Sequence, residues 1–192
     1  MTRAGDFFGQ RKRLVQGALG AALLVSLGAL SWRQCAMYVD LDTLWSTTIA
    51  RNPNSWMAHN NFGIDLAREG RTEEAIDHFN RALELNPHHD EADYNLANAL
   101  LRLKREDEAI PHYEASLKIN PRNTRAHFNL AAVLAHKGRA EEAIFHYNNV
   151  LEVYPNDPVV HNNLEKMLRQ LGRTDEADAH LRKAEAAQRR PH

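Results

Sequence analysis

Hydrophobic, small and polar positions recur every 34 residues from residue 56 to the end of the chain. Within each period, apolar residues return at intervals of three and four in two successive stretches, which is the spacing of one face of an α-helix. The two stretches meet at a short polar break, at Gly70-Arg71, Lys104-Arg105, Gly138-Arg139 and Gly172-Arg173. A proline precedes each period, at Pro53, Pro87, Pro121 and Pro155. The pattern therefore predicts repeated units of helix, turn and helix.

Two kinds of side chain fill the places where the two helices of a unit are expected to meet. Small residues stand at the eighth and twentieth places, in Gly63, Ala97, Ala131, Ala75, Ala109, Ala143 and Ala177. Bulky residues stand at the eleventh and twenty-fourth places, in Leu66, Leu100, Leu134, Leu168, Phe79, Tyr113, Tyr147 and Leu181. Small side chains let two helices approach closely, and bulky ones fill the seam between them.

These places resemble the signature of the tetratricopeptide repeat (TPR) family, and the resemblance extends over all four periods. It implies an all-α fold, with a right-handed α-solenoid of about four repeats at residues 56–89, 90–123, 124–157 and 158–192. The stretch from Asp40 to Asn52 is expected to form a further helix, so that residues 33–55 act as a connector and a partial capping repeat.

Three local departures from the pattern carry their own expectations. In the fourth repeat, polar residues replace small or apolar ones at Glu165, Asp178 and Glu185, which indicates the polar outer face of a terminal repeat. Lys104 stands where the other breaks have glycine, and we expect a cost of up to about 1 kcal/mol there. Pro111 is expected near the start of its helix, where a missing amide hydrogen costs little.

The N-terminal part of the chain differs in composition from the repeats. Residues 1–13 form a basic tail, and residues 14–32 contain no charged side chain. As a helix rising about 1.5 Å per residue, the uncharged run would be roughly 28 Å long, close to the hydrocarbon thickness of a bilayer. It therefore predicts a single transmembrane helix, with the tail in the cytoplasm and the repeats extracytoplasmic, in the periplasm of a bacterium. A cleaved secretory signal ending near Ala29-Leu30-Ser31 and a buried helix of a soluble protein are the alternatives.

A second resemblance lies between the uncharged run and the repeats. The chain there is similar to the junction in membrane glycosyltransferases of the O-mannosyltransferase type, where the last transmembrane helix leads into C-terminal TPRs, through the residues Trp32-Arg33, Tyr38, Asp40, Thr43-Leu44-Trp45 and Asn52-Pro53. The many membrane helices and the acidic catalytic loop of such enzymes have no counterpart in this sequence. The resemblance therefore carries over no catalytic residue.

Composition excludes several classes of function. The chain has 24 basic and 25 acidic residues, so its charges nearly cancel. The overall charge therefore gives no indication of nucleic acid as a partner. The single cysteine, Cys35, excludes an internal disulfide framework and a cysteine zinc site. We find no arrangement of nucleophile and base and no glycine-rich phosphate loop, so the sequence predicts that the protein is not an enzyme and has no cofactor.

Histidine stands at the twenty-third place of every repeat, in His78, His112, His146 and His180. Equivalent places in successive repeats are separated by about one helix diameter, roughly 10 Å. Ligands of one zinc ion each lie about 2 Å from it, so these histidines are too far apart to share an ion. We therefore expect no metal site, and we interpret these histidines as solvent-facing or rim residues.

Asparagine stands at the sixth place of every repeat, in Asn61, Asn95, Asn129 and Asn163. The TPR superhelix of O-GlcNAc transferases carries such an asparagine ladder, and the resemblance implies that these amides point into the concave groove. A carboxamide both donates and accepts hydrogen bonds, so it suits the backbone of an extended peptide. The alternative is that the amides only tie helix ends or turns within the fold.

Further groove positions follow from the same register. They are Tyr94 and Phe128 at the fifth place, Asn98 at the ninth, and Arg68, Arg102 and His136 at the thirteenth. Together they predict a mildly basic, partly aromatic surface. Tyr94 and Phe128 have the alternative role of packing between repeats.

The sequence thus favours a membrane-anchored TPR scaffold that binds an extended peptide or a partner protein in its concave groove. The alternative function is that of a substrate-presenting TPR tail of a truncated or split membrane glycosyltransferase. Residues 14–32 are the predicted membrane contact, and the sequence leaves the oligomeric state open.

Overall fold

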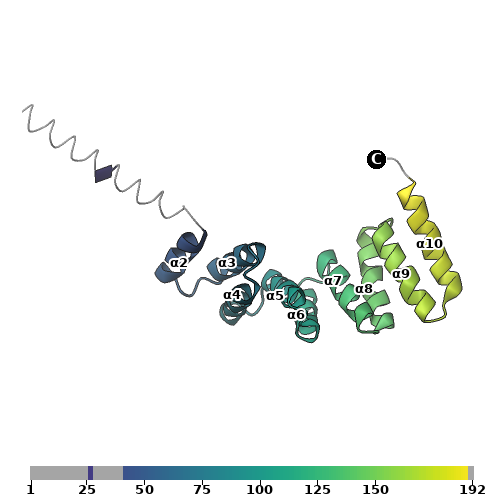
Figure 1. Ribbon diagram of the computed structural model, residues 1–192, viewed down its shortest axis with the longest axis horizontal. Helices are drawn as coiled ribbons and strands as arrows, with labels where there is room; N and C mark the ends of the chain where they lie inside the picture. Colours follow the sequence, from purple (N-terminus) through teal and green to yellow (C-terminus); the bar gives the residue numbers. More distant parts are fainter. Residues whose placement is uncertain (1–25, 28–40, 190–192) are drawn as a thin grey trace, which may run out of the picture. The chain divides into compact units, whose positions relative to one another are not determined.

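The computed structural model describes residues 26–27 and 41–189, and the chain divides into two compact units, residues 1–53 and 54–192. In the first unit, α2 (Leu41–Arg51) is the helix expected between Asp40 and Asn52. The second unit is a succession of helices that follow one another in chain order (Figure 1). Among the described residues every regular element is a helix, which confirms the all-α prediction for this part of the chain.

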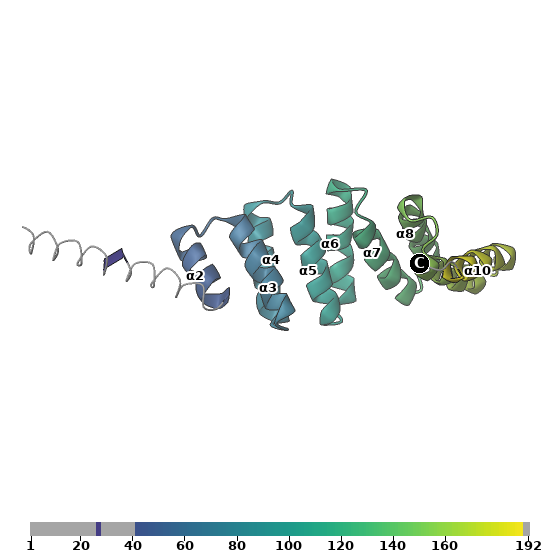
Figure 2. The same cartoon turned by 90° about the horizontal axis from the view of Figure 1, so that it is seen from above.

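The second unit consists of four helix pairs. Each helix packs against the next one along the chain, and α3 also contacts α5 directly (Figure 2). The pairs are α3 (Trp56–Arg68) with α4 (Thr72–Leu85), α5 (Asp90–Arg102) with α6 (Glu106–Ile119), α7 (Thr124–His136) with α8 (Ala140–Val153), and α9 (Pro158–Gln170) with α10 (Thr174–Gln188). We call α3, α5, α7 and α9 the first helices of the repeats, and the face that they form the groove face.

The first helix of each repeat begins at a side-chain cap. The capping side chain accepts a hydrogen bond from a backbone amide in the first turn, which would otherwise have no partner. The four caps are Ser55, His89, Asn123 and Asp157. Because they lie 34 residues apart, the caps fix the register of the repeats along with the core residues.

The core lies in the seams between helices, as the small and bulky places predict. Tyr113 is 0% exposed and Tyr147 is 2% exposed, and Ala109, one turn before Tyr113 on α6, is completely buried. Gly63 shows why a small residue is needed, because a Cβ atom added there would lie 2.7 Å from the ring of Phe79. Close helix approach at these places is therefore a packing requirement of this chain.

Two residues of the second repeat depart from helical backbone rules. Lys104 has φ +60°, the left-handed conformation that Gly70, Gly138 and Gly172 adopt in the other repeats. Pro111 is the sixth residue of α6, at a place where an amide hydrogen would bond the carbonyl oxygen of Asp107. The expectation that the proline costs little is therefore wrong, because the orphan amides of a helix are only the first four.

Replacing Lys104 by glycine is expected to raise the free energy of unfolding by about 0.5 to 1 kcal/mol, because glycine adopts positive φ without a Cβ clash. Chemical denaturation of the wild type and the variant measures the difference. Lys137→Gly is the control, since Lys137 has φ −80° and glycine there should lower stability. A loss of stability in Lys104→Gly would contradict the assignment of strain to this turn.

The polar residues of the fourth repeat form ion pairs. Arg169 bonds both Glu165 and Asp178, the latter at 2.9 Å, and Arg189 lies 3.4 Å from Glu185. Only Ala177 and Ala184 are buried in α10. The fourth repeat thus has the polar outer side that a terminal repeat requires.

No helix within residues 26–27 and 41–189 is long and apolar enough to cross a membrane. The predicted tail at residues 1–13 and nearly all of the predicted transmembrane helix at residues 14–32 lie outside the described residues, the exceptions being Ser26 and Leu27.

Candidate functional site

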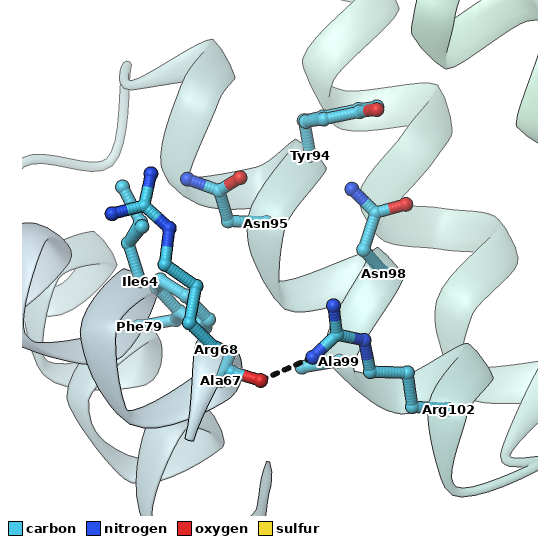
Figure 3. A pocket seen from close by; sticks show the side chains of 9 residues that line it. All are labelled: Ile64, Ala67, Arg68, Phe79, Tyr94, Asn95, Asn98, Ala99 and Arg102. Carbon is cyan, nitrogen blue, oxygen red and sulfur yellow. Dashed lines mark hydrogen bonds between the residues drawn. The ribbon is translucent and has the colours of Figure 1, made fainter. Parts of the chain in front are cut away.

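A pocket opens between α3 and α5 on the groove face. It has a volume of about 380 Å³ and is lined by Ile64, Ala67, Arg68, Phe79, Tyr94, Asn95, Asn98, Ala99 and Arg102. Figure 3 shows the polar side chains standing around the open space, with Arg68 opposite Asn98 and Arg102. Five of the predicted groove residues therefore meet at one place, which we call the α3–α5 pocket.

The two arginines of the α3–α5 pocket keep donors for a ligand. Arg68 forms an exposed ion pair with Asp65 at 3.1 Å, and pairs of this kind contribute at most about 1 kcal/mol. Arg102 donates from Nη1 to the carbonyl oxygen of Ala67, which joins the first two repeats. A guanidinium carries five N–H donors, so one or two bonds do not exhaust it. No acidic side chain is among the residues that line the pocket.

Asn98 lies at the centre of a hydrogen-bond network between the second and third repeats. Its Oδ1 accepts from the Tyr113 hydroxyl at 2.6 Å and from Nδ2 of Asn129 at 2.8 Å. Figure 3 shows Nδ2 of Asn98 on the side that faces the pocket. The same side chain thus ties two repeats together and presents a donor to the pocket.

The asparagine ladder takes part in the fold at three of its four places. Nδ2 of Asn95 lies 3.4 Å from Oδ1 of Asn60, and Asn129 bonds Asn98 as described. Nδ2 of Asn163 donates to the Tyr147 hydroxyl at 3.1 Å. Asn61 is exposed on α3. These contacts give the amides a structural role, and their role in binding a peptide stays a prediction.

A second, smaller pocket of about 210 Å³ lies between the second and third repeats. The predicted groove residues Tyr94, Phe128 and Asn129 line it, together with Thr124, Arg125, Val150, Tyr154 and Asp157. The Arg125 guanidinium lies 5.1 Å from the centre of the Tyr94 ring, which is a cation–π distance. The sequence prediction missed Arg125 and Tyr154, because neither occupies a repeated signature place.

Asn61, Asn163 and His136 line neither of these two pockets. His136 is exposed at the end of α7, where its Nδ1 lies 2.9 Å from a carboxylate oxygen of Glu106. It therefore belongs to a hydrogen-bonded contact between neighbouring repeats rather than to the pocket that contains Arg102.

The buried tyrosines that support the groove face are held in their neutral form. Burial raises the pKa of the Tyr113 hydroxyl far above its usual value, although a hydrogen bond from Asn129 opposes the shift. Burial likewise raises the pKa of Tyr147, against the opposing bond from Asn163. Both hydroxyls therefore keep a proton to donate.

The histidines at the twenty-third place are rim residues and do not face solvent fully, so of the two roles expected from the sequence the rim position is the one observed. All four are partly buried, and each contacts the fourth residue of its own repeat. No group of three or more histidine, cysteine, aspartate or glutamate side chains suited to hold a metal ion occurs in the described part of the chain.

Models of the tetratricopeptide repeat match the chain at residues 43–89, 60–123, 104–167 and 166–183. No curated protein matches it. Solved structures of MamA are similar in fold. One from Desulfovibrio magneticus RS-1 is 23% identical, with a TM-score of 0.71 over 88% of this chain and 95% of that one.

Two further MamA structures are comparable. One is 18% identical, with a TM-score of 0.72 over 86% of this chain and 90% of that one. The other, MamA AMB-1, is 25% identical, with a TM-score of 0.68 over 72% of this chain and 75% of that one. The likeness is one of fold, an α-solenoid.

Proposed function

Because the chain belongs to the tetratricopeptide repeat family, we propose that its repeats form a scaffold that binds an extended, acidic segment of a partner protein on the groove face. The scaffold has no catalytic activity of its own in this proposal. The α3–α5 pocket is the observation that carries it, since two arginines, two carboxamides and a tyrosine side chain line one open space there.

The chemistry of the pocket favours an acidic peptide. Guanidinium groups bind carboxylates through two parallel hydrogen bonds, and Arg68 and Arg102 stand on two sides of the space. Carboxamides such as those of Asn95 and Asn98 suit the peptide backbone, because each amide group has a donor and an acceptor. The apolar floor of Ile64 and Phe79 accommodates a side chain that points inward.

The size of the pocket also fits a peptide segment. Binding pockets for small ligands commonly have volumes of about 300 to 1,000 Å³, and the α3–α5 pocket lies within that range at about 380 Å³. The second pocket, with Tyr94 shared between the two, continues the same face toward the third repeat. A segment of several residues would contact both.

The experiment measures binding of synthetic peptides of equal length and unrelated sequence, with acidic, neutral or basic side chains, by fluorescence anisotropy. Acidic peptides should bind most tightly, and their affinity should fall as salt is added, because exposed charge pairs are screened. Equal binding of acidic and basic peptides would contradict the proposed partner chemistry.

We further propose that residues 14–32 anchor the protein in a membrane once, with the repeats on the extracytoplasmic side. The support is the uncharged run and the three basic residues just before it, Arg11, Lys12 and Arg13. Fractionation should recover the full-length chain with membranes, and protease added from the extracytoplasmic side should digest the repeats. Recovery of a shortened soluble chain beginning near Trp32 would favour a cleaved signal instead.

No observation on the described residues or in the comparisons favours the alternative of a glycosyltransferase tail. It stays a prediction from the short stretch between Trp32 and Pro53 alone.

A further inference from the structure

Each repeat holds a polar pair that joins its two helices, between its fourth and twenty-third places. In the first, third and fourth repeats both members are histidines, and their Nδ1 atoms are 2.8 to 2.9 Å apart. In the second repeat the pair is Asp93 with His112, at 2.9 Å between Oδ1 and Nδ1. The histidine pairs are His59 with His78, His127 with His146, and His161 with His180.

The surrounding bonds fix where the protons lie in two of the histidine pairs. Nε2 of His127 donates to the carbonyl oxygen of Pro121 at 3.1 Å, and Nε2 of His161 donates to that of Pro155 at 3.0 Å. A neutral histidine with its proton on Nε2 accepts at Nδ1. The partner, His146 or His180, must therefore donate from its own Nδ1.

Each histidine pair consequently has room for one proton between its Nδ1 atoms. A first added proton can reside on the outer nitrogen of His146 and leaves the bond between the rings intact. A second would place N–H donors on both Nδ1 atoms at 2.8 Å, and the two like charges would repel in a partly buried seam. The folded pair therefore resists double protonation.

The charged groups around the pairs do not compensate such a charge. For His146 they are His127 on α7 and Glu142 with Arg139 at the start of α8. Glu142 is already bonded through both carboxylate oxygens to Arg139, at 2.7 and 2.6 Å. Burial, followed by repulsion from His127, lowers the pKa of His146 to about 4.

In the other two pairs a glutamate bound to an arginine recurs, with one further charged group near each. Burial and then His59 lower the pKa of His78, and the charged groups near it are Asp77, Glu74 and Arg71. Burial and then His161 lower the pKa of His180, which also lies near Lys183 and Glu176. Glu74 and Glu176 are each bound to an arginine, as Glu142 is.

We propose that the three histidine pairs are acid-sensitive contacts that hold together the two helices of the first, third and fourth repeats. The aspartate–histidine pair in turn makes the second repeat acid-resistant. Mild acidification would then loosen three repeats and spare the one that contributes most of the α3–α5 pocket. The second repeat is spared because protonation of His112 adds charge to its bond with the Asp93 carboxylate.

The direction of the pH effect follows from proton counting. In the unfolded chain both histidines of a pair take up protons below about pH 6.5, whereas the folded pair resists holding both protons. The unfolded state therefore binds more protons between about pH 6.5 and pH 4, and stability falls as the pH falls through that window. The contribution of each pair is fully present above about pH 6.5.

Thermal unfolding of the wild type, of His127→Asp and of Asp93→His, each at about pH 7.5 and about pH 5, tests the proposal. Each histidine pair should lower the melting temperature on acidification by roughly 2 to 4 °C. His127→Asp creates an aspartate–histidine pair like that of the second repeat, so the melting temperature should fall less by the contribution of one histidine pair. Asp93→His adds a fourth histidine pair and should increase the fall by the same amount.

Other histidines also affect the fall in melting temperature on acidification, such as His89, whose Nδ1 caps α5 by accepting from the Ala92 amide. Their effect is common to all three proteins, so it cancels when the falls of the variants and the wild type are compared. If one variant fails to fold, the other still decides the outcome. Hydrogen exchange at acidic pH should also give lower protection in α7 and α8 than in α6. Equal falls in all three proteins, or equal loss of protection in all repeats, would overturn the proposal.

Discussion

Replacing Tyr113 by alanine is expected to lower the free energy of unfolding by about 3 to 5 kcal/mol, the range for removal of a buried aromatic side chain. Tyr113 is completely buried in α6, and its ring centre lies 6.1 Å from that of Tyr94 on α5. Its hydroxyl donates to Oδ1 of Asn98, which also accepts from Asn129 of the next repeat. The truncation therefore leaves a cavity and removes the hydroxyl that bonds Asn98, the residue through which the second repeat contacts Asn129. Urea denaturation, followed by circular dichroism, measures the loss.

Two companion variants separate the causes of that loss. Tyr113→Phe removes only the hydroxyl and should cost about 0.5 to 1.5 kcal/mol, the net contribution of one hydrogen bond. Leu181→Ala removes the equivalent side chain of the fourth repeat, which is partly exposed, and should cost less than Tyr113→Ala. If Tyr113→Ala cost no more than Tyr113→Phe, the packing of the ring would not be the main source of stability at this seam.

Reversing the charge of Arg68 is expected to weaken binding of an acidic peptide by about 10- to 100-fold. A hydrogen bond between charged groups contributes about 1.5 to 3 kcal/mol, and every 1.4 kcal/mol is a factor of about ten in affinity. Arg68→Glu also places a negative charge next to Arg102, so that position 68 repels the acidic peptide instead of attracting it. The side chain of Arg68 is largely exposed, so the melting temperature should change little. Anisotropy titrations with the acidic peptide measure the change in affinity.

Arg182→Glu is the matched control, because it makes the same change in net charge at an exposed position of α10. Its effect on affinity should be small at physiological salt, where charges interact over about 8 Å. Equal losses in Arg68→Glu and Arg182→Glu would mean that the peptide responds to overall charge and that the α3–α5 pocket does not hold it.

The helices of the repeats could be predicted from the sequence because several local signals coincide. Ser55, Asn123 and Asp157 are standard cap residues, and the observed helices begin directly after them. Glycine at positions 70 and 138 predicts the left-handed turns there from the local sequence alone, because no distant contact is needed to produce them. His89 is a cap that residue preferences do not predict, and the period alone places it.

The hydrogen bonds of the groove amides could not be predicted from the sequence. Asn129 meets Asn98 across a gap of 31 residues, in the neighbouring repeat. Whether a carboxamide reaches such a partner or solvent depends on its rotamer and on the exact separation of two helices, which periodicity does not specify. The same limit applies to Arg102, whose partner Ala67 lies 35 residues away.

The histidine pairs escaped prediction for a different reason. The 34-residue period relates equivalent places of successive repeats, whereas His127 and His146 belong to one repeat and lie 19 residues apart. The signal was present, because histidine recurs at the fourth place in three repeats as it does at the twenty-third in four. Pairing places within a repeat requires knowing which turns of two antiparallel helices face each other.

Site-specific photocrosslinking in cells tests most directly whether the groove face holds a partner segment. A photoreactive phenylalanine derivative replaces Tyr94, which lines both pockets, or Phe145, which is 62% exposed on α8. We expect that the Tyr94 position yields a defined crosslinked protein, that the Phe145 position does not, and that Arg68→Glu abolishes the crosslink. A crosslink that forms at Phe145 instead, or that persists unchanged with Arg68→Glu, would contradict binding at the α3–α5 pocket.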